Sequence, residues 1–90
     1  MLVEGLVTRD RQVIMKWVQE RGAKPVFRRR IRGTEILKEL EISFPDDGED
    51  GWIEEISWET FFDKFEKEQL VFVYQERTNS GELSHYYGFL

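Results

Sequence analysis

Residues 26–44 decide the fold, and they read Val-Phe-Arg-Arg-Arg-Ile-Arg-Gly-Thr-Glu-Ile-Leu-Lys-Glu-Leu-Glu-Ile-Ser-Phe. Two runs rich in apolar residues are separated by Gly33-Thr34, which is typical of a β-hairpin whose two-residue turn has a positive φ at its glycine. If Arg32 lies opposite Glu35, one face of the hairpin is largely apolar and the other is charged. In this register the facing pairs are Ile31 with Ile36, Phe27 with Leu40, and Arg28 with Glu39.

A helix is predicted before this hairpin, over about residues 9–21. Thr8 is the expected N-cap, and Asp10 would lie in the first turn, where a carboxylate interacts favourably with the helix dipole. Gly22 followed by Pro25 is typical of a helix end, because glycine adopts the left-handed conformation and proline cannot continue the helix. The apolar side chains at helical spacing are Val13, Ile14, Trp17 and Val18.

A second helix is predicted to begin after Ser57, its expected N-cap. Its apolar stripe follows the i, i+3, i+4, i+7 spacing. Beyond this helix, residues 70–77 and 82–90 are expected to form a second hairpin around the turn at residues 78–81. The side chains of the stripe are Trp58, Phe61, Phe62 and Phe65.

These elements predict an α+β domain in the order αββαββ. A chain of 90 residues has room for one small core, so we expect a single domain over residues 1–90. The two hairpins are expected to form one mainly antiparallel sheet, with both helices packed on one face.

Residues 45–51, Pro-Asp-Asp-Gly-Glu-Asp-Gly, are predicted to form a mobile surface loop, because they contain four carboxylates and no apolar anchor. In a calcium-binding EF-hand loop, Asp46, Asp50 and Gly51 would take positions 1, 5 and 6. Position 12 must supply a bidentate glutamate, but here it would be Ser57. We therefore expect no metal site and no cofactor site.

The composition argues against several classes of protein. With no Cys, the chain has neither a disulfide framework nor a thiolate zinc site. The longest apolar run, residues 70–74, is far too short to cross a membrane, and the N-terminus shows no export signal. We therefore expect a cytoplasmic protein that does not contact membranes.

The sequence also argues against an enzyme. A serine or cysteine nucleophile needs an oriented base, and the only histidine is His85. Its neighbour Ser84 would point to the opposite face of a strand, where His85 cannot activate it. We therefore expect no catalytic residues.

Charge is divided unevenly along the chain. The net charge is −5, but residues 1–38 carry +6 and residues 39–90 carry −11. Such asymmetry marks either a surface for an acidic partner or two halves that neutralise each other within the fold. Cations concentrate between Lys24 and Arg32, where Arg28 and Arg32 would face glutamates. Arg29 opposite Lys38 would place two cations on the apolar face, where they either extend to the rim or bind an anion.

These residues define the candidate binding surface. Arginines on an exposed strand can contact phosphates without reading a sequence. Trp and Tyr side chains outside the helix stripes are common at protein interfaces. The candidate partner-binding residues are Lys24, Arg28, Arg29, Arg30, Arg32, Lys38, Trp52, Tyr86 and Tyr87.

Several segments resemble a known family. The segments are Thr8-Arg9-Asp10, residues 21–25, residues 70–76 and, most specifically, residues 54–65, Glu-Glu-Ile-Ser-Trp-Glu-Thr-Phe-Phe-Asp-Lys-Phe. Together they resemble a family of small bacterial proteins that often carry a "1,4-alpha-glucan branching enzyme" label. The resemblance implies no catalytic residue, and branching chemistry needs a barrel of about 250 residues.

Two functional hypotheses follow. The first is a non-catalytic cytoplasmic protein-protein interaction module or adaptor, whose partner could be another protein or a second copy pairing along the hairpin edge. The alternative is a nucleic-acid- or phosphate-binding protein that uses the basic segment from Lys24 to Arg32.

Overall fold

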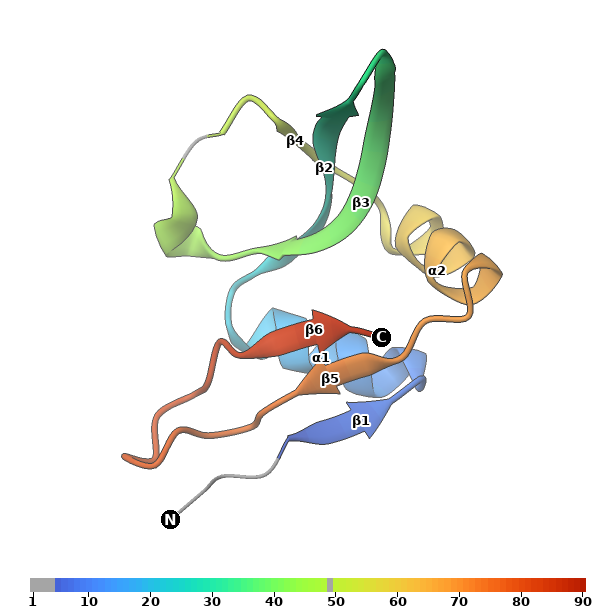
Figure 1. Cartoon of the computed structure of the whole chain (residues 1–90). Coiled ribbons are helices and arrows are strands. Elements are labelled where there is room, and N and C mark those ends of the chain that lie inside the picture. Colours follow the sequence, from blue (N-terminus) through green and yellow to red (C-terminus); the bar gives the residue numbers. More distant parts are fainter. Residues whose placement is uncertain (1–4, 49) are drawn as a thin grey trace.

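The computed structural model describes residues 5–48 and 50–90 of the chain (Figure 1). They form an α+β domain with two helices and two antiparallel three-stranded sheets. None of the described helices is long and apolar enough to cross a membrane. In chain order the elements are β1 (Leu6–Thr8), α1 (Arg11–Glu20), β2 (Lys24–Arg32), β3 (Glu35–Ser43), the 3₁₀ helix η1 (Pro45–Asp47), β4 (Ile53–Glu55), α2 (Trp58–Lys67), β5 (Phe72–Tyr74) and β6 (Tyr87–Phe89).

The predicted hairpin register is confirmed. Strands β2 and β3 pair antiparallel with Arg32 opposite Glu35, and Gly33 in the turn has a φ of 62°. The apolar pairs Ile31–Ile36 and Phe27–Leu40 therefore share one face, as the alternation of residue types requires. This hairpin is the longest pairing in the described chain.

The prediction of one sheet and the order αββαββ is wrong, because two strands were missed. β4 adds to β2 to give the order β3-β2-β4, and β1 adds to β5 to give β1-β5-β6. Each missed strand has only three residues, too few for a two-residue alternation to be recognised in the sequence. The second predicted hairpin is also shorter than expected, with strand pairing concentrated at Phe72–Tyr74 and Tyr87–Phe89.

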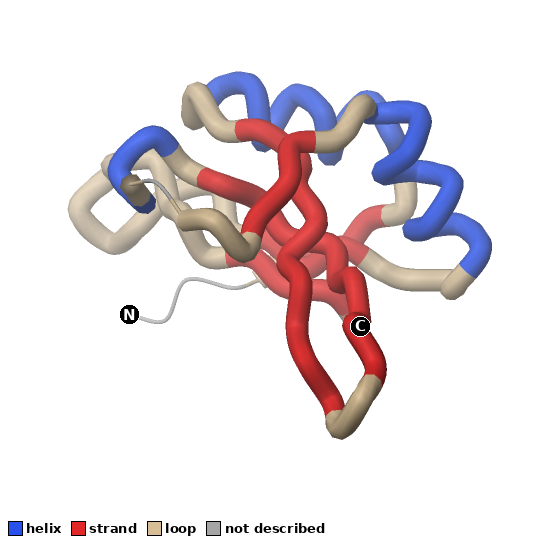
Figure 2. Tube along the Cα trace, turned by 90° about the horizontal axis from the view of Figure 1, so that it is seen from above, coloured by secondary structure: helices blue, strands red, loops and turns tan. Residues whose placement is uncertain are grey.

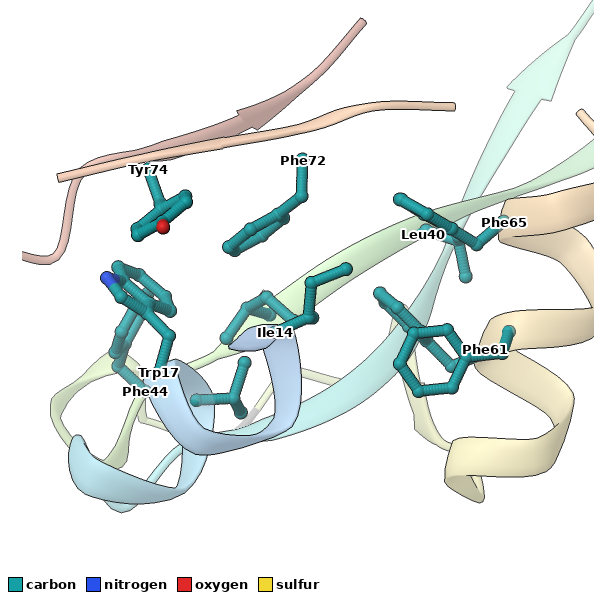
Figure 3. Packing of buried hydrophobic residues seen from close by; sticks show 11 residues of the cluster. Ile14, Trp17, Leu40, Phe44, Phe61, Phe65, Phe72 and Tyr74 are labelled. Carbon is teal, nitrogen blue, oxygen red and sulfur yellow. The ribbon is translucent and has the colours of Figure 1, made fainter. Parts of the chain in front are cut away.

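One aromatic core holds both sheets together (Figure 3). Trp17 of α1 is 1% exposed and packs edge-on against Phe72 of β5, with ring centroids 5.4 Å apart. Phe61 and Phe65 of α2 contact Phe89 of β6 from the other end of the core. The inner ends of β2 and β3 supply Val26, Leu40 and Ile42 to the buried set.

The N-cap of α1 differs from the prediction, and the N-cap of α2 agrees with it. Asp10, not Thr8, is the N-cap of α1, because its Oδ1 accepts hydrogen bonds from the backbone N–H groups of Gln12 and Val13 at 2.8 and 3.3 Å. Thr8 lies two residues earlier, and its hydroxyl accepts the N–H of Asp10 at 3.0 Å. Ser57 caps α2 as predicted, accepting the N–H of Thr60 at 3.1 Å.

A buried arginine that the sequence analysis did not single out fixes the chain after β5. The Arg21 side chain is fully buried, and its guanidinium donates to the carbonyls of Trp17, Glu76 and Ser84 at 2.8, 2.8 and 2.6 Å. The same group stacks on the Trp17 ring at 4.0 Å. Burial lowers the pKa of Arg21, and these carbonyls replace the water that the cation loses.

Both helices end in the same hydrogen-bonded motif, although with different residues at the left-handed position. After α1, Gly22 has a φ of 64° and the N–H of Ala23 donates to the carbonyl of Val18. After α2, Gln69 has a φ of 54° and the N–H of Leu70 donates to the carbonyl of Phe65. This is the Schellman geometry, which favours glycine because a Cβ is crowded in the left-handed region.

We therefore predict that Gln69→Gly raises the free energy of unfolding by about 1 kcal/mol, and that the reverse change, Gly22→Gln, lowers it by a similar amount. Urea denaturation followed by tryptophan fluorescence measures both. A Gln69→Gly variant no more stable than the parent would contradict the conformational explanation.

Candidate interaction site on the β2–β3 arm

The outer half of the β2–β3 hairpin projects away from the rest of the chain (Figures 1 and 2). The third strand, β4, pairs with β2 only at Val26–Arg28, so residues 29–38 have no further strand beside them. We call residues 29–38 the arm. At its tip Ile31 and Ile36 are 64% and 67% exposed, a large exposure for two β-branched apolar side chains.

The arm presents one mixed apolar and cationic face. Ile31 and Ile36 lie opposite each other, and the next pair on the same face is Arg29 with Lys38. The backbone N–H of Arg29 donates to the carbonyl of Trp52 at 2.8 Å, which aligns Trp52 with this pair. Trp52 is 51% exposed. The exposed apolar side chains of this face are therefore Ile31, Ile36 and Trp52.

At the base of the arm, Arg28 is held by two carboxylates. Its Nε and Nη2 donate to the two oxygens of Glu41 at 2.8 and 2.9 Å, and its Nη1 donates to Asp50 at 2.9 Å. These hydrogen bonds raise the pKa of Arg28 above its usual value. The forked geometry satisfies the guanidinium within the fold, so Arg28 has little capacity left for an external anion.

Asp50 connects the 45–52 segment to the arm. Its Oδ1 accepts the backbone N–H of Trp52 at 2.8 Å, while its Oδ2 accepts from Arg28. The hydrogen bond from Trp52, and then that from Arg28, lower the pKa of Asp50. Residues 45–51 were predicted to form a mobile surface loop with no apolar anchor. Residues 45–47 instead form η1, and its Asp47 accepts the N–H of Phe44 at 2.8 Å. Glu49 of the expected loop lies outside the described residues.

The two cations on the apolar face are both engaged. Arg29 donates from Nη2 to the carbonyl of Gly51 at 2.7 Å. Lys38 lies 3.5 Å from a carboxylate oxygen of Glu54 and 5.7 Å from the centre of the Phe27 ring. Of the two alternatives that the sequence left open, these contacts favour extension to the rim.

The remaining cations pair diagonally or not at all. Arg30 contacts Glu39 at 2.9 Å, and Lys24 contacts Glu55 at 3.2 Å. Arg28 faces Glu39 as predicted, but the two side chains do not form an ion pair, because strand twist brings diagonal side chains within reach of each other. Arg32 lies opposite Glu35 as predicted, but it forms no ion pair with any described residue.

The two candidate tyrosines occupy separate places. The Tyr87 hydroxyl accepts the N–H of Ile42 at 3.1 Å, and burial raises the pKa of Tyr87. The hydrogen bond between Tyr87 and Ile42 ties β6 to the base of β3. Tyr87 also lines a hollow of about 440 Å³ together with Arg28 and Asp50. Tyr86 is 60% exposed and does not line this hollow.

Ser84 and His85 do not form a nucleophile–base pair. The buried Ser84 hydroxyl donates to the side-chain oxygen of Gln75 at 2.6 Å and accepts the N–H of Tyr86 at 3.1 Å. The exposed His85 ring stacks on Phe44 with centroids 4.3 Å apart. Each side chain therefore has a packing or hydrogen-bonding role of its own.

Comparison with known proteins does not assign the chain to a family. No protein-family model, curated protein or solved structure matches the chain. The resemblance to the small bacterial family therefore stays a prediction.

The contacts of Asp50 predict a pH-dependent contribution to stability. Because its pKa is lower in the folded chain than in the unfolded one, its contribution is present above the unfolded pKa and is lost as the pH falls through the folded pKa. Asp50→Asn should therefore be less stable than the parent at about pH 7, and this difference should shrink towards about pH 2.

Urea denaturation of both proteins at several pH values measures the difference. Asp46→Asn, in the same segment, controls for the loss of one negative charge. A difference between parent and Asp50→Asn that stays constant from neutral to acidic pH would show that the Asp50 charge does not stabilise the fold.

Proposed function

We propose that this protein is a non-catalytic interaction module that acts in the cytoplasm, and that Ile31, Ile36 and Trp52 form its contact surface for a protein partner. The observation that carries this proposal is the pair of isoleucines at the tip of a projecting arm. Burying one such side chain stabilises a folded protein by about 1.5–3 kcal/mol. Because the two isoleucines at the tip are exposed, this small domain does not gain that free energy from them. A protein partner that covers the pair would recover this free energy.

The engaged cations support recognition by apolar contact. Arg28, Arg29 and Lys38 already have partners within the chain, at distances of 2.7 to 3.5 Å. Displacing these partners would expose carboxylates and a carbonyl to a bound anion. The long aliphatic parts of Arg29 and Lys38 instead extend the apolar surface beside the isoleucines.

The open edge of the hairpin is a less suitable contact. Strand β3 forms one edge of its sheet and carries charged residues on both faces, among them Glu35, Lys38 and Glu39. Charged side chains on an edge strand discourage pairing with another strand. We therefore place the partner on the face of the arm and not along the β3 edge.

The polar groups of the hollow beside Tyr87 support a role without catalysis. Arg28, Asp50 and Tyr87, which line it, each make hydrogen bonds within the chain. A catalytic group needs a free donor, acceptor or nucleophile directed at substrate. Of these groups, the Tyr87 hydroxyl joins β6 to β3, and the Arg28–Asp50 contact joins β2 to the segment before β4.

The arm predicts which substitution removes partner binding. Ile31→Asp should abolish capture of the partner that the immobilised parent retains from a lysate, because a carboxylate at the centre of the apolar pair must be desolvated on contact. The matched control is Val7→Asp, since Val7 is also a strand residue and is also 64% exposed. Capture that is equal for both variants, or lost with both, would contradict the assignment to the arm.

A second candidate function, nucleic-acid or phosphate binding, rests on Arg32, an arm cation whose side chain makes neither an ion pair nor a hydrogen bond with a described residue. Binding through Lys24–Arg32 would weaken steeply with added salt, whereas apolar contact would persist. We expect the parent to show no binding to a mixed oligonucleotide pool at about 0.15 M salt by fluorescence anisotropy. Salt-sensitive binding that Arg29→Glu with Arg30→Glu removes would favour this second candidate over the protein partner.

A further inference from the structure

The β1-β5-β6 sheet has one face in the core and one that is open. Phe72 and Tyr74 point inward and are buried, so the alternating residues Val71 and Val73 point outward. On the neighbouring strands Val7 and Gly88 lie in register with Val73. Tyr86 and Leu90 alternate with the inward Tyr87 and Phe89. We call this the outer sheet face and define it by Val7, Val71, Val73, Tyr86, Gly88 and Leu90.

The outer sheet face is exposed. Val7, Tyr86 and Leu90 are 64%, 60% and 75% exposed. A Cβ placed on Gly88 would have no heavy atom within 4 Å other than those of Gly88 and its chain neighbours, so the space above this part of the edge strand β6 is open. Figures 1 and 2 show α1 on the opposite side of this sheet.

The outer sheet face carries no charged side chain, although 34% of the residues in the chain are charged. An antiparallel sheet with one face in water normally places polar residues on that face. Here five of the six residues are Val, Leu or Tyr at exposed or half-buried positions, and no described helix covers them. Such a face is a docking surface for another apolar surface.

Charge and symmetry favour a second copy of this chain as the occupant. In a contact with two-fold symmetry each patch meets the same patch, so a charged patch would place like charges together. Two copies that each carry −5 repel one another over most of their surfaces. The outer sheet face avoids this repulsion at the contact. We propose that two copies of the protein associate through it, sheet against sheet.

The size of the face sets the strength of this dimer. Three strands about 4.8 Å apart, each three residues long at about 3.4 Å per residue, cover about 150 Å². A stable interface takes roughly 800 Å² from each partner. The dimer is therefore weak, forming at high protein concentration and separating on dilution. It does not involve the arm, so it is independent of the proposed function.

Sedimentation equilibrium over a wide range of concentrations tests this inference. The weight-average mass of the parent should rise from 10.8 kDa towards twice that value. Val7→Asp and Gly88→Glu should each keep the protein monomeric over the same range. Gly88→Glu is the cleaner variant, because its side chain enters open space and displaces nothing in the fold.

Two controls separate this inference from the function of the arm. Ile31→Asp changes the arm, and Gln19→Glu adds a negative charge to the exposed side of α1. Both should dimerise like the parent. A parent that stays at 10.8 kDa at every concentration would overturn the inference and leave the face to a different partner. A dimer that survives Gly88→Glu, or is lost with Ile31→Asp, would also overturn it.

Discussion

A single aromatic core serves both sheets, and the rest of the structure depends on that packing. Neither sheet can form a core alone, because four of the six strands have only three residues. Trp17, Phe61 and Phe72 lie where the two sheets and both helices meet, and each is at most 1% exposed. A core this small uses most of the aromatic side chains of the chain. The apolar residues left outside it are concentrated on the arm and on the outer sheet face.

The uneven charge of the sequence is largely neutralised within the fold. Cations from residues 1–38 contact carboxylates from residues 39–90. Several of these contacts join one helix or strand to another. Arg11 of α1 forms a two-point contact with Glu66 of α2 at 2.7 Å, and this hydrogen bond lowers the pKa of Glu66. The other pairs of this kind are Lys24–Glu55, Arg28–Glu41, Arg28–Asp50, Arg30–Glu39 and Lys38–Glu54.

Local sequence patterns predicted most of the helices and strands. The features that these patterns did not predict depend on contacts between residues far apart in the sequence. The β2–β3 register and the cap at Ser57 depend on residues close in sequence, so alternation and turn chemistry were enough to find them. The strands Leu6–Thr8 and Ile53–Glu55 form only because a distant strand offers an edge. The roles of Arg21 and Asp50 likewise depend on partners from other elements. The hydrogen bond from Trp52 to Asp50 is local, but no local pattern could have shown that Asp50 also accepts from Arg28.

The central claim is that the arginines of the hairpin other than Arg32 are occupied within the fold, which leaves apolar contact for recognition. Heteronuclear NMR of the arginine Nε–H groups, during titration with inorganic phosphate, tests this claim most directly. The account predicts slow hydrogen exchange and no phosphate response at Arg28, a small response at Arg30, and the fastest exchange and largest response at Arg32. Equal exchange rates and equal phosphate responses at all three arginines would contradict it.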